Sequence, residues 1–303
     1  MILDLNSREK VKRLIRTGKS EEVLKGELVI EDEVVRKALA CEHVGFEEKK
    51  SFVESFGLDL ITVSPQAMNE SKQIKDLSSK DYQFPDLQKW VTQTECFTFA
   101  ILDGAFERGI QTQGMGEFFR LLRTAPTALQ EWNQAVEKLN LNLVQRLEAE
   151  GVDGIILADD VAYAGGLMVH PQSLKDHFMP SLARQVEEIK RSGLTVFYHS
   201  DGNYRMVLDD ILQAGFDGLH CIDRNSNMEI AELQKEVGDQ ICLWGHLDVQ
   251  DLEEVVQDLG SLEQQTKSIK NLASGHRFLL GTSSGLFEGM NIQGLKELYQ
   301  NLK

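Results

Sequence analysis

The chain has 303 residues, of which 42% are hydrophobic and 26% charged, so it can bury a large core. Its 48 acidic and 32 basic residues give a net charge of -16, which on average repels phosphate backbones and anionic membrane surfaces. We therefore expect no nucleic-acid partner, and no apolar stretch approaches the roughly 20 residues of a membrane helix.

The chain opens with an expected helical extension over residues 1–26, which lacks the apolar core and cleavage site of a secretory signal. Short apolar runs then alternate with longer segments of helical spacing, and this alternation indicates parallel strands. The eight expected strands are Glu27–Ile30, Leu58–Val63, Phe97–Leu102, Gly154–Leu157, Thr195–Tyr198, Gly218–His220, Ile241–Trp244 and Arg277–Leu280.

Two connecting segments show clear helical signals. Apolar residues recur every three or four positions over Thr127–Glu150, and Gly151 follows as a stop. The next expected helix begins near Pro171 and runs to about Arg191. The polar segment Gln66–Gln93 is predicted to be a long loop over one end of the strands.

Eight strands are the number that closes a parallel barrel without leaving an edge, and a barrel needs roughly 250 residues. We therefore predict a single (β/α)₈ barrel domain over residues 1–303. An open doubly wound sheet would show a similar alternation, but no Gly-rich dinucleotide-binding turn follows an early strand. The four scattered cysteines form no CxxC pair, which favours reduced thiols in the cytoplasm.

Polar residues follow nearly every expected strand, at the end where parallel barrels place catalytic groups. Any single Asp or Ser among them could instead cap a helix, but their concentration at one end indicates a site. They are Glu31, Asp32, Ser64, Asp103, Asp159, Asp160, His199, Ser200, Asp201, Cys221, Asp223, His246, Asp248, Thr282, Ser283 and Ser284.

His199 and Asp201 directly follow the apolar run TVFY in the motif YHSDGN. Residues i and i+2 of an extended chain point to the same side, so both side chains can line the barrel axis. Such a pair can bind a divalent cation or act as general acid and base, and His246 can add a second imidazole. The structural alternative is a histidine that is hydrogen-bonded to a neighbouring carboxylate.

The stretch from Asp153 to Asp223, with its motifs LADDVAYAGG and VFYHSDGN, resembles the uroporphyrinogen decarboxylase superfamily. The later motifs ICLWGHLDV and FLLGTSSGL share the resemblance, which begins near Phe97. The superfamily contains porphyrinogen decarboxylases and corrinoid (cobalamin)-dependent methyltransferases, both built on barrels. The resemblance therefore implies an enzyme of one of these two kinds.

This sequence departs from the patterns of both branches. The amino-terminal motif RQAGRYLPEY, with which the decarboxylases bind porphyrinogen carboxylates, is missing. The methyltransferase zinc ligands His-x-Cys and a final Cys are replaced by His199-Ser200-Asp201 and Thr282-Ser283-Ser284. These departures favour a harder N/O metal site, made by His199, Asp201 and a carboxylate such as Glu31 or Asp160.

The expected function is methyl transfer between a corrinoid-binding partner protein and a small molecule, assisted by zinc or another divalent metal. His199, Asp201, Asp160 and His246 are the expected catalytic residues, and His199 and Asp201 bind the metal with His246 or Glu31. The expected substrate-binding groups are Asp103, Asp159, Asp223 and Ser284.

Two alternatives remain open at the level of sequence. One is a decarboxylase acting on a tetrapyrrole without a cofactor, in which Asp103 or Asp160 stabilises the cationic intermediate. The other is a non-catalytic barrel that binds a corrinoid or a partner.

Overall fold

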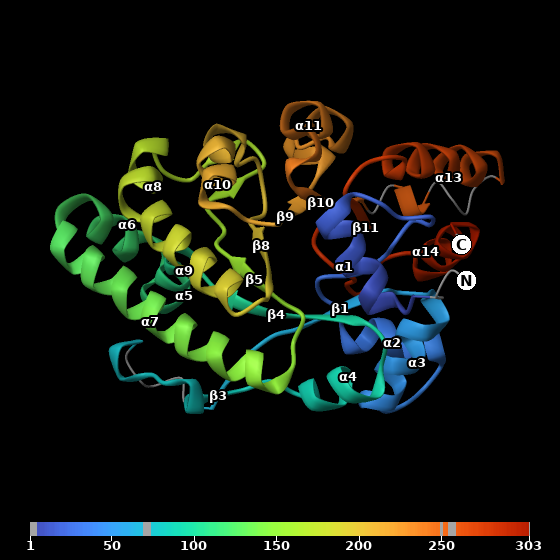
Figure 1. Ribbon diagram of the computed structural model, residues 1–303, viewed down its shortest axis with the longest axis horizontal. Coiled ribbons are helices and arrows are strands. Elements are labelled where there is room, and N and C mark those ends of the chain that lie inside the picture. Colours follow the sequence, from blue (N-terminus) through green and yellow to red (C-terminus); the bar gives the residue numbers. More distant parts are fainter. Residues whose placement is uncertain (1–4, 69–73, 249–250, 254–258, 303) are drawn as a thin grey trace. The chain divides into compact units, whose positions relative to one another are not determined.

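In the computed structural model, residues 5–68, 74–248, 251–253 and 259–302 are described. The seven principal strands are β1 (Leu60–Val63), β4 (Phe97–Asp103), β5 (Gly154–Ala158), β8 (Thr195–His199), β9 (Gly218–Ile222), β10 (Cys242–Leu247) and β11 (Phe278–Thr282). They form one sheet in the order β1-β4-β5-β8-β9-β10-β11, and each register given for this sheet is parallel (Figure 1). This is the parallel α/β barrel class that the sequence predicts.

Helices separate the strands along the chain. They are α1 (Ser7–Thr17), α2 (Asp32–Leu39), α3 (Phe46–Phe56), α4 (Leu87–Gln93), α5 (Ala105–Gln113), α6 (Met115–Thr124), α7 (Pro126–Glu150), α8 (Pro171–His177), α9 (Met179–Arg191), α10 (Leu208–Ala214), α11 (Ile230–Val237), α13 (Leu259–Ala273) and α14 (Ile292–Asn301). No helix among the described residues is long and apolar enough to cross a bilayer.

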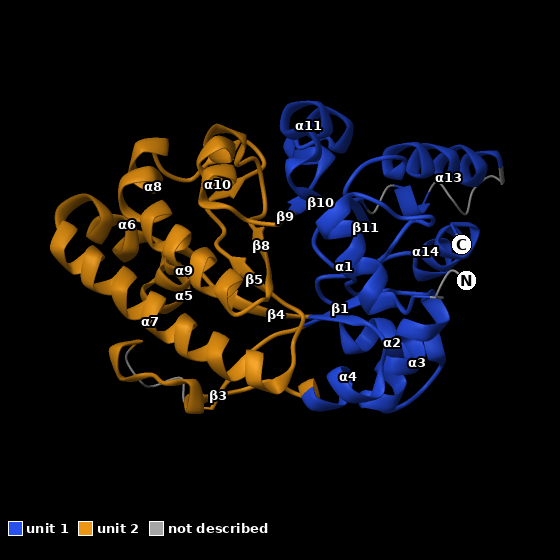
Figure 2. Cartoon of the chain, in the orientation of Figure 1, with its two compact units in different colours: residues 1–62, 88–98, 220–303 blue, residues 63–87, 99–219 orange. Residues whose placement is uncertain are grey.

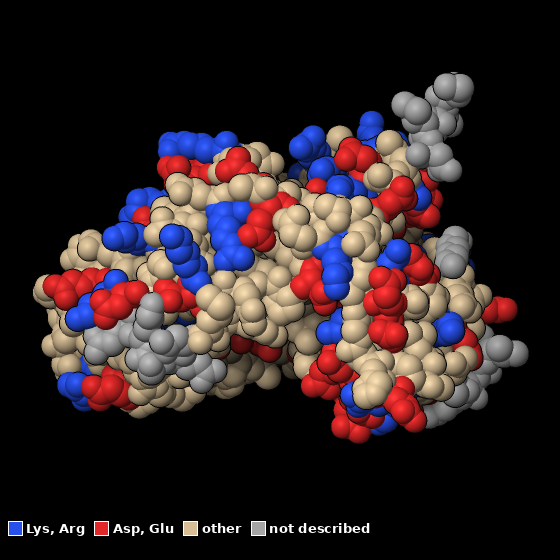
Figure 3. Space-filling view, turned by 90° about the horizontal axis from the view of Figure 1, so that it is seen from below, with Lys and Arg blue, Asp and Glu red and all other residues tan. Residues whose placement is uncertain are grey.

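The chain divides into two compact units (Figure 2). Unit 1 contains residues 1–62, 88–98 and 220–303, and unit 2 contains residues 63–87 and 99–219. On the face shown in Figure 3, described Lys and Arg residues are interspersed with Asp and Glu and do not gather into one basic surface.

The expected first strand over Glu27–Ile30 is not formed as a strand: within these residues Ile30 makes a single parallel bridge, to Leu286. Single parallel bridges instead join Lys25 to Leu280 of β11 and Gly26 to Leu60 of β1, both within unit 1. The Glu27 side chain between these bridges and Ile30 is buried inside the unit. Its carboxylate accepts hydrogen bonds from the Thr282 hydroxyl and the Tyr299 hydroxyl, each at 2.5 Å.

Burial raises the pKa of Glu27 from 4.5 to about 7. The folded protein then binds a proton that the unfolded chain has released, so stability falls as the pH rises from about 4.5 to 7. We expect Glu27→Gln to flatten this part of the stability curve. Urea unfolding at several pH values measures it, with the exposed Glu21→Gln as the control. Parallel curves for the wild type and Glu27→Gln would contradict the assignment.

Two further boundaries differ from the predicted ones. The expected helix from Pro171 to Arg191 is two helices that meet at Phe178, because Pro180 lacks an N–H and begins α9 in its first turn. The expected loop Gln66–Gln93 ends in helix α4 and contains the short antiparallel pair β2 (Gln66–Ala67) and β3 (Tyr82–Gln83).

Unit 2 brings the carboxyl ends of three strands into register. Asp103 at the end of β4 pairs with Ala158 of β5, and Ala158 pairs with His199 of β8. The strand interiors are almost entirely buried, and α9 packs against β8 while α7 packs against α9. The polar residues that follow Ala158 therefore emerge between Asp103 and His199.

Candidate functional site

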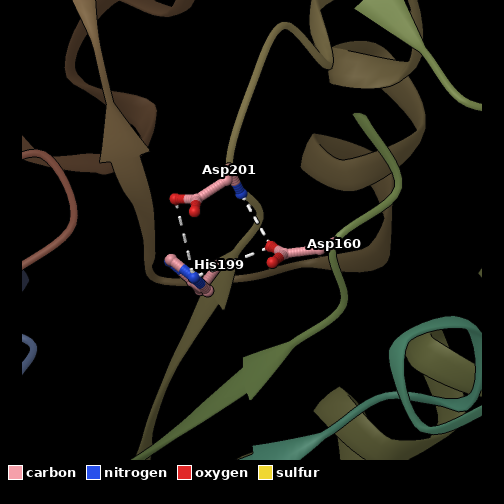
Figure 4. Close-up of side chains that lie close together, drawn as sticks. All are labelled: Asp160, His199 and Asp201. Atoms are coloured by element: carbon pink, nitrogen blue, oxygen red, sulfur yellow. Dashed lines mark hydrogen bonds and ion pairs between the residues drawn. The ribbon is translucent and has the colours of Figure 1, made fainter. Parts of the chain in front are cut away.

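His199 lies between two carboxylates at the end of β8 (Figure 4). Its Nε2 atom is 3.7 Å from Asp160 Oδ1 and 4.0 Å from Asp201 Oδ1. The imidazole is largely buried, whereas the Asp201 side chain is 50% exposed, so the group is open to solvent on one side. The structure thus brings together three of the four expected catalytic residues.

Hydrogen bonds donated by main-chain N–H groups join the segments that carry these three side chains. The Asp159 N–H donates to the His199 carbonyl at 2.8 Å, and the Asp201 N–H donates to Asp160 Oδ1 at 2.7 Å. Further along, the Asn203 N–H donates to the Tyr163 carbonyl at 2.9 Å. The segments after β5 and β8 are therefore held as one layer.

The hairpin formed by β6 (Ala162–Tyr163) and β7 (Gly166–Leu167) lies directly on the turn after Asp201. Gly202 in that turn has φ +80°, and a Cβ atom there would lie 2.5 Å from the Tyr163 backbone. Only glycine permits this close approach without a shift of the hairpin.

The three side chains fit the requirements of a divalent cation. One nitrogen and two carboxylate oxygens lie within 4.8 Å of one another. A tetrahedral zinc ion with bonds of about 2.1 Å separates its ligands by about 3.4 Å, so small side-chain rotations suffice to close the set. The Asp201 N–H also orients the Asp160 carboxylate, as the outer hydrogen bonds of metal sites do.

Asp159 and Asp103, two of the expected substrate-binding residues, also belong to unit 2, where Asp159 precedes Asp160 and Asp103 lies at the end of β4. Asp159 is fully buried, its carboxylate accepts the Glu107 N–H at 2.8 Å, and burial raises its pKa to about 8. Asp103 forms an ion pair with the buried Arg108 guanidinium at 3.2 Å. Arg108 also donates to the Tyr82 hydroxyl at 2.9 Å, so its positive charge is already engaged.

The remaining expected site residues belong to unit 1. Asp223 caps the short turn Arg224–Ser226, and Glu31 is exposed and accepts the Glu288 N–H at 2.8 Å. His246 lies within β10 with φ 101°, and burial lowers its pKa. Ser284 is half-buried after β11. Of the carboxylates considered as a third ligand, Asp160 is the one found with His199 and Asp201 among the described residues.

Comparison with known proteins decides the family. The sequence profile described as uroporphyrinogen decarboxylase (URO-D) matches residues 107–303, which is well over half of the chain. The chain belongs to the uroporphyrinogen decarboxylase family. The match includes the segments that carry Asp160, His199 and Asp201.

Solved structures show that the similarity of fold extends beyond residues 107–303 to nearly the whole of this URO-D family member. A methyltransferase from Methanosarcina mazei has a TM-score of 0.75 at 11% identity, with 98% of each chain covered. The spore cortex-lytic enzyme SleL of Bacillus megaterium QM B1551 has a TM-score of 0.53 at 10% identity, covering 94% of this chain and 75% of that one. No curated protein sequence matches. At these identities the structures show a shared fold.

Glu107, whose N–H donates to the Asp159 carboxylate at 2.8 Å, was not predicted from the sequence. It lies in the first turn of α5, and burial raises its pKa, as do the negative charges of Asp160, Asp103 and Asp201. A signal was present, because α5 begins directly after Asp103 and Gly104 at the end of β4. The first turn of such a helix follows the strand end directly, so its backbone lies beside the strand-end residues.

Proposed function

We propose that this URO-D family member is a metal-assisted methyltransferase that moves a methyl group between a corrinoid carried by a partner protein and a small molecule. The observation that carries the proposal is the group Asp160, His199 and Asp201, whose ligand atoms fit a divalent cation. The family membership and the fold shared with a methyltransferase support it.

The ligand chemistry favours an oxygen- or nitrogen-containing partner in the reaction over a thiol. One imidazole and two carboxylates are harder ligands than thiolates and suit zinc or a similar divalent ion. Such an ion, when bound, acts as a Lewis acid that polarises a substrate oxygen. The corrinoid would supply or receive the methyl group, while Asp160, His199 and Asp201 would hold the ion against the substrate oxygen or nitrogen that exchanges it.

The surrounding charges disfavour a porphyrinogen with eight carboxylates. Asp103, Glu107, Asp160 and Asp201 act on one another as like charges. A polyanion would therefore enter a region of negative charge, and the Arg108 guanidinium beside it is already paired with Asp103.

Methyl transfer can be tested with free cobalamins as probes. We expect zinc-loaded protein to demethylate methylcobalamin with tetrahydrofolate as acceptor, or to methylate cob(I)alamin with a methoxyarene as donor, as measured by the cobalamin absorbance. The His199→Ala protein should show no rate above the reaction without protein. Absence of transfer in both directions, together with conversion of uroporphyrinogen to coproporphyrinogen, would replace this proposal with the decarboxylase.

A further inference from the structure

Ser200 connects His199 and Asp201, two of the three residues drawn in Figure 4. Ser200 is fully buried, whereas the Asp201 side chain is half-exposed. The ligand chemistry described above uses the two outer residues of this His-Ser-Asp motif and gives the serine no part. The hydrogen bonds of its hydroxyl within unit 2 indicate a part for it.

The Ser200 hydroxyl bonds to the backbone of both carboxylate-bearing segments. Its Oγ atom accepts the Val161 N–H at 3.2 Å and donates to the Asp201 carbonyl at 2.9 Å. A hydroxyl has one proton and two lone pairs, so these two bonds use its proton and one acceptor position. Val161 directly follows Asp160. One side chain therefore joins the backbone beside Asp160 to the backbone of Asp201.

The backbone on the other side of Asp160 is also bonded to β8. The Tyr198 hydroxyl donates to the Asp159 carbonyl at 3.1 Å, and the Asp159 N–H donates to the His199 carbonyl at 2.8 Å. Asp160 therefore lies between two residues whose backbones are both hydrogen-bonded to the end of β8 or the residue after it. The bond at Val161 is made by a serine side chain, so one small substitution removes it.

We propose that Ser200 is a positioning residue of the metal site, which holds Asp160 at the correct distance from His199 and Asp201. The outer residues of the motif supply ligand atoms, and the middle residue fixes the segment that supplies the third. Without the hydroxyl, the buried Val161 N–H loses its acceptor, and the segment that carries Asp160 shifts to find another. The inference rests on the proposed metal site.

A double-mutant cycle on metal affinity tests the proposal. The affinity for Co²⁺ is measured by competition with a chromophoric chelator for the wild type, Ser200→Ala, Asp160→Ala and the double variant. We expect Ser200→Ala to weaken binding about tenfold, as the loss of an outer hydrogen bond does at metal sites. In the Asp160→Ala background the same change should have almost no further effect, because Ser200 acts through Asp160.

A second buried serine of unit 2 provides the matched control. Ser181 of α9 donates its hydroxyl proton to Glu137 Oε2 at 2.7 Å, a bond that involves no member of the ligand group. Ser181→Ala should therefore leave the Co²⁺ affinity unchanged. The visible spectrum of bound Co²⁺, which depends on the geometry of its ligands, should change in Ser200→Ala and stay as in the wild type in Ser181→Ala.

The outcomes distinguish this inference from the proposed function. If the folded wild type does not bind Co²⁺, the metal site itself is wrong. Wild-type binding that Ser200→Ala leaves unchanged refutes the role of Ser200 while the metal site stands. A full loss in the Asp160→Ala background, or an equal loss in Ser181→Ala, shows that Ser200 does not act by positioning Asp160. Circular dichroism establishes that each variant is folded, which we expect for Ser200→Ala because Tyr198 still holds the Asp159 carbonyl.

Discussion

His199→Ala should weaken the binding of Zn²⁺ or Co²⁺ by about a hundredfold or more, since it removes the one nitrogen ligand of a three-residue set. The remaining ligands, Asp160 and Asp201, also repel each other once the imidazole and the ion are gone. Elemental analysis of protein prepared without chelator, followed by Co²⁺ titration, measures the loss. About one equivalent of metal per chain is expected in the wild type.

Two other variants should show a smaller loss of metal affinity and no loss, respectively. Asp160→Asn keeps an oxygen for the Asp201 N–H but loses its charge, so we expect a loss of about tenfold. The exposed His170 caps α8 and takes no part in the group, so His170→Ala should retain the metal. Equal metal content in wild type and His199→Ala would remove the proposed site and favour a metal-free hydrogen-bonded pair.

Gly202→Ala should destabilise the protein by about 3 kcal/mol, from a left-handed backbone and a steric overlap together. Its φ of +80° disfavours any L side chain, and the added Cβ would lie 2.5 Å from the Tyr163 backbone. The hairpin would have to move away from the turn that carries Asp201. Urea unfolding monitored by circular dichroism measures the free energy of unfolding.

Gly193 provides the matched control for this prediction. Its φ of +77° is nearly the same, but no atom lies within 4 Å of its added Cβ. Gly193→Ala should therefore show the backbone contribution alone, about 1 kcal/mol. If both variants lower the free energy of unfolding by the same amount, the close approach of the hairpin to Gly202 does not contribute to stability.

The strands were predictable from sequence because each buried parallel strand is a short run of apolar residues. The pairing near the amino terminus was not predictable, because Lys25 and Gly26 make only single bridges and are themselves not apolar residues. The break at Phe178 was visible in principle, since Pro180 interrupts a helical pattern.

The spacing of His199 and Asp201 predicted two members of the site, because the end of a strand fixes the direction of both side chains. Asp160 was predicted from its position after β5, but as one of two alternative metal carboxylates. Glu107 lies beyond the strand-end pattern, and only the start of α5 directly after Asp103 and Gly104 indicates its place beside Asp159. The assignments of His246 and Glu31 as ligands stay predictions.

The two segments that hold the site are joined largely through main-chain groups: the Asp159 N–H, the His199 and Tyr163 carbonyls, and the Asn203 N–H. Main-chain hydrogen bonds do not depend on which side chains their residues carry. They do depend on the number of residues that separate one bonded position from the next along each segment. The positions 161–163, which follow the carboxylates, should therefore accept substitution more readily than insertion or deletion. The exposed Tyr163 and the tip of its hairpin can then vary while the spacing to Asp160, His199 and Asp201 stays constant.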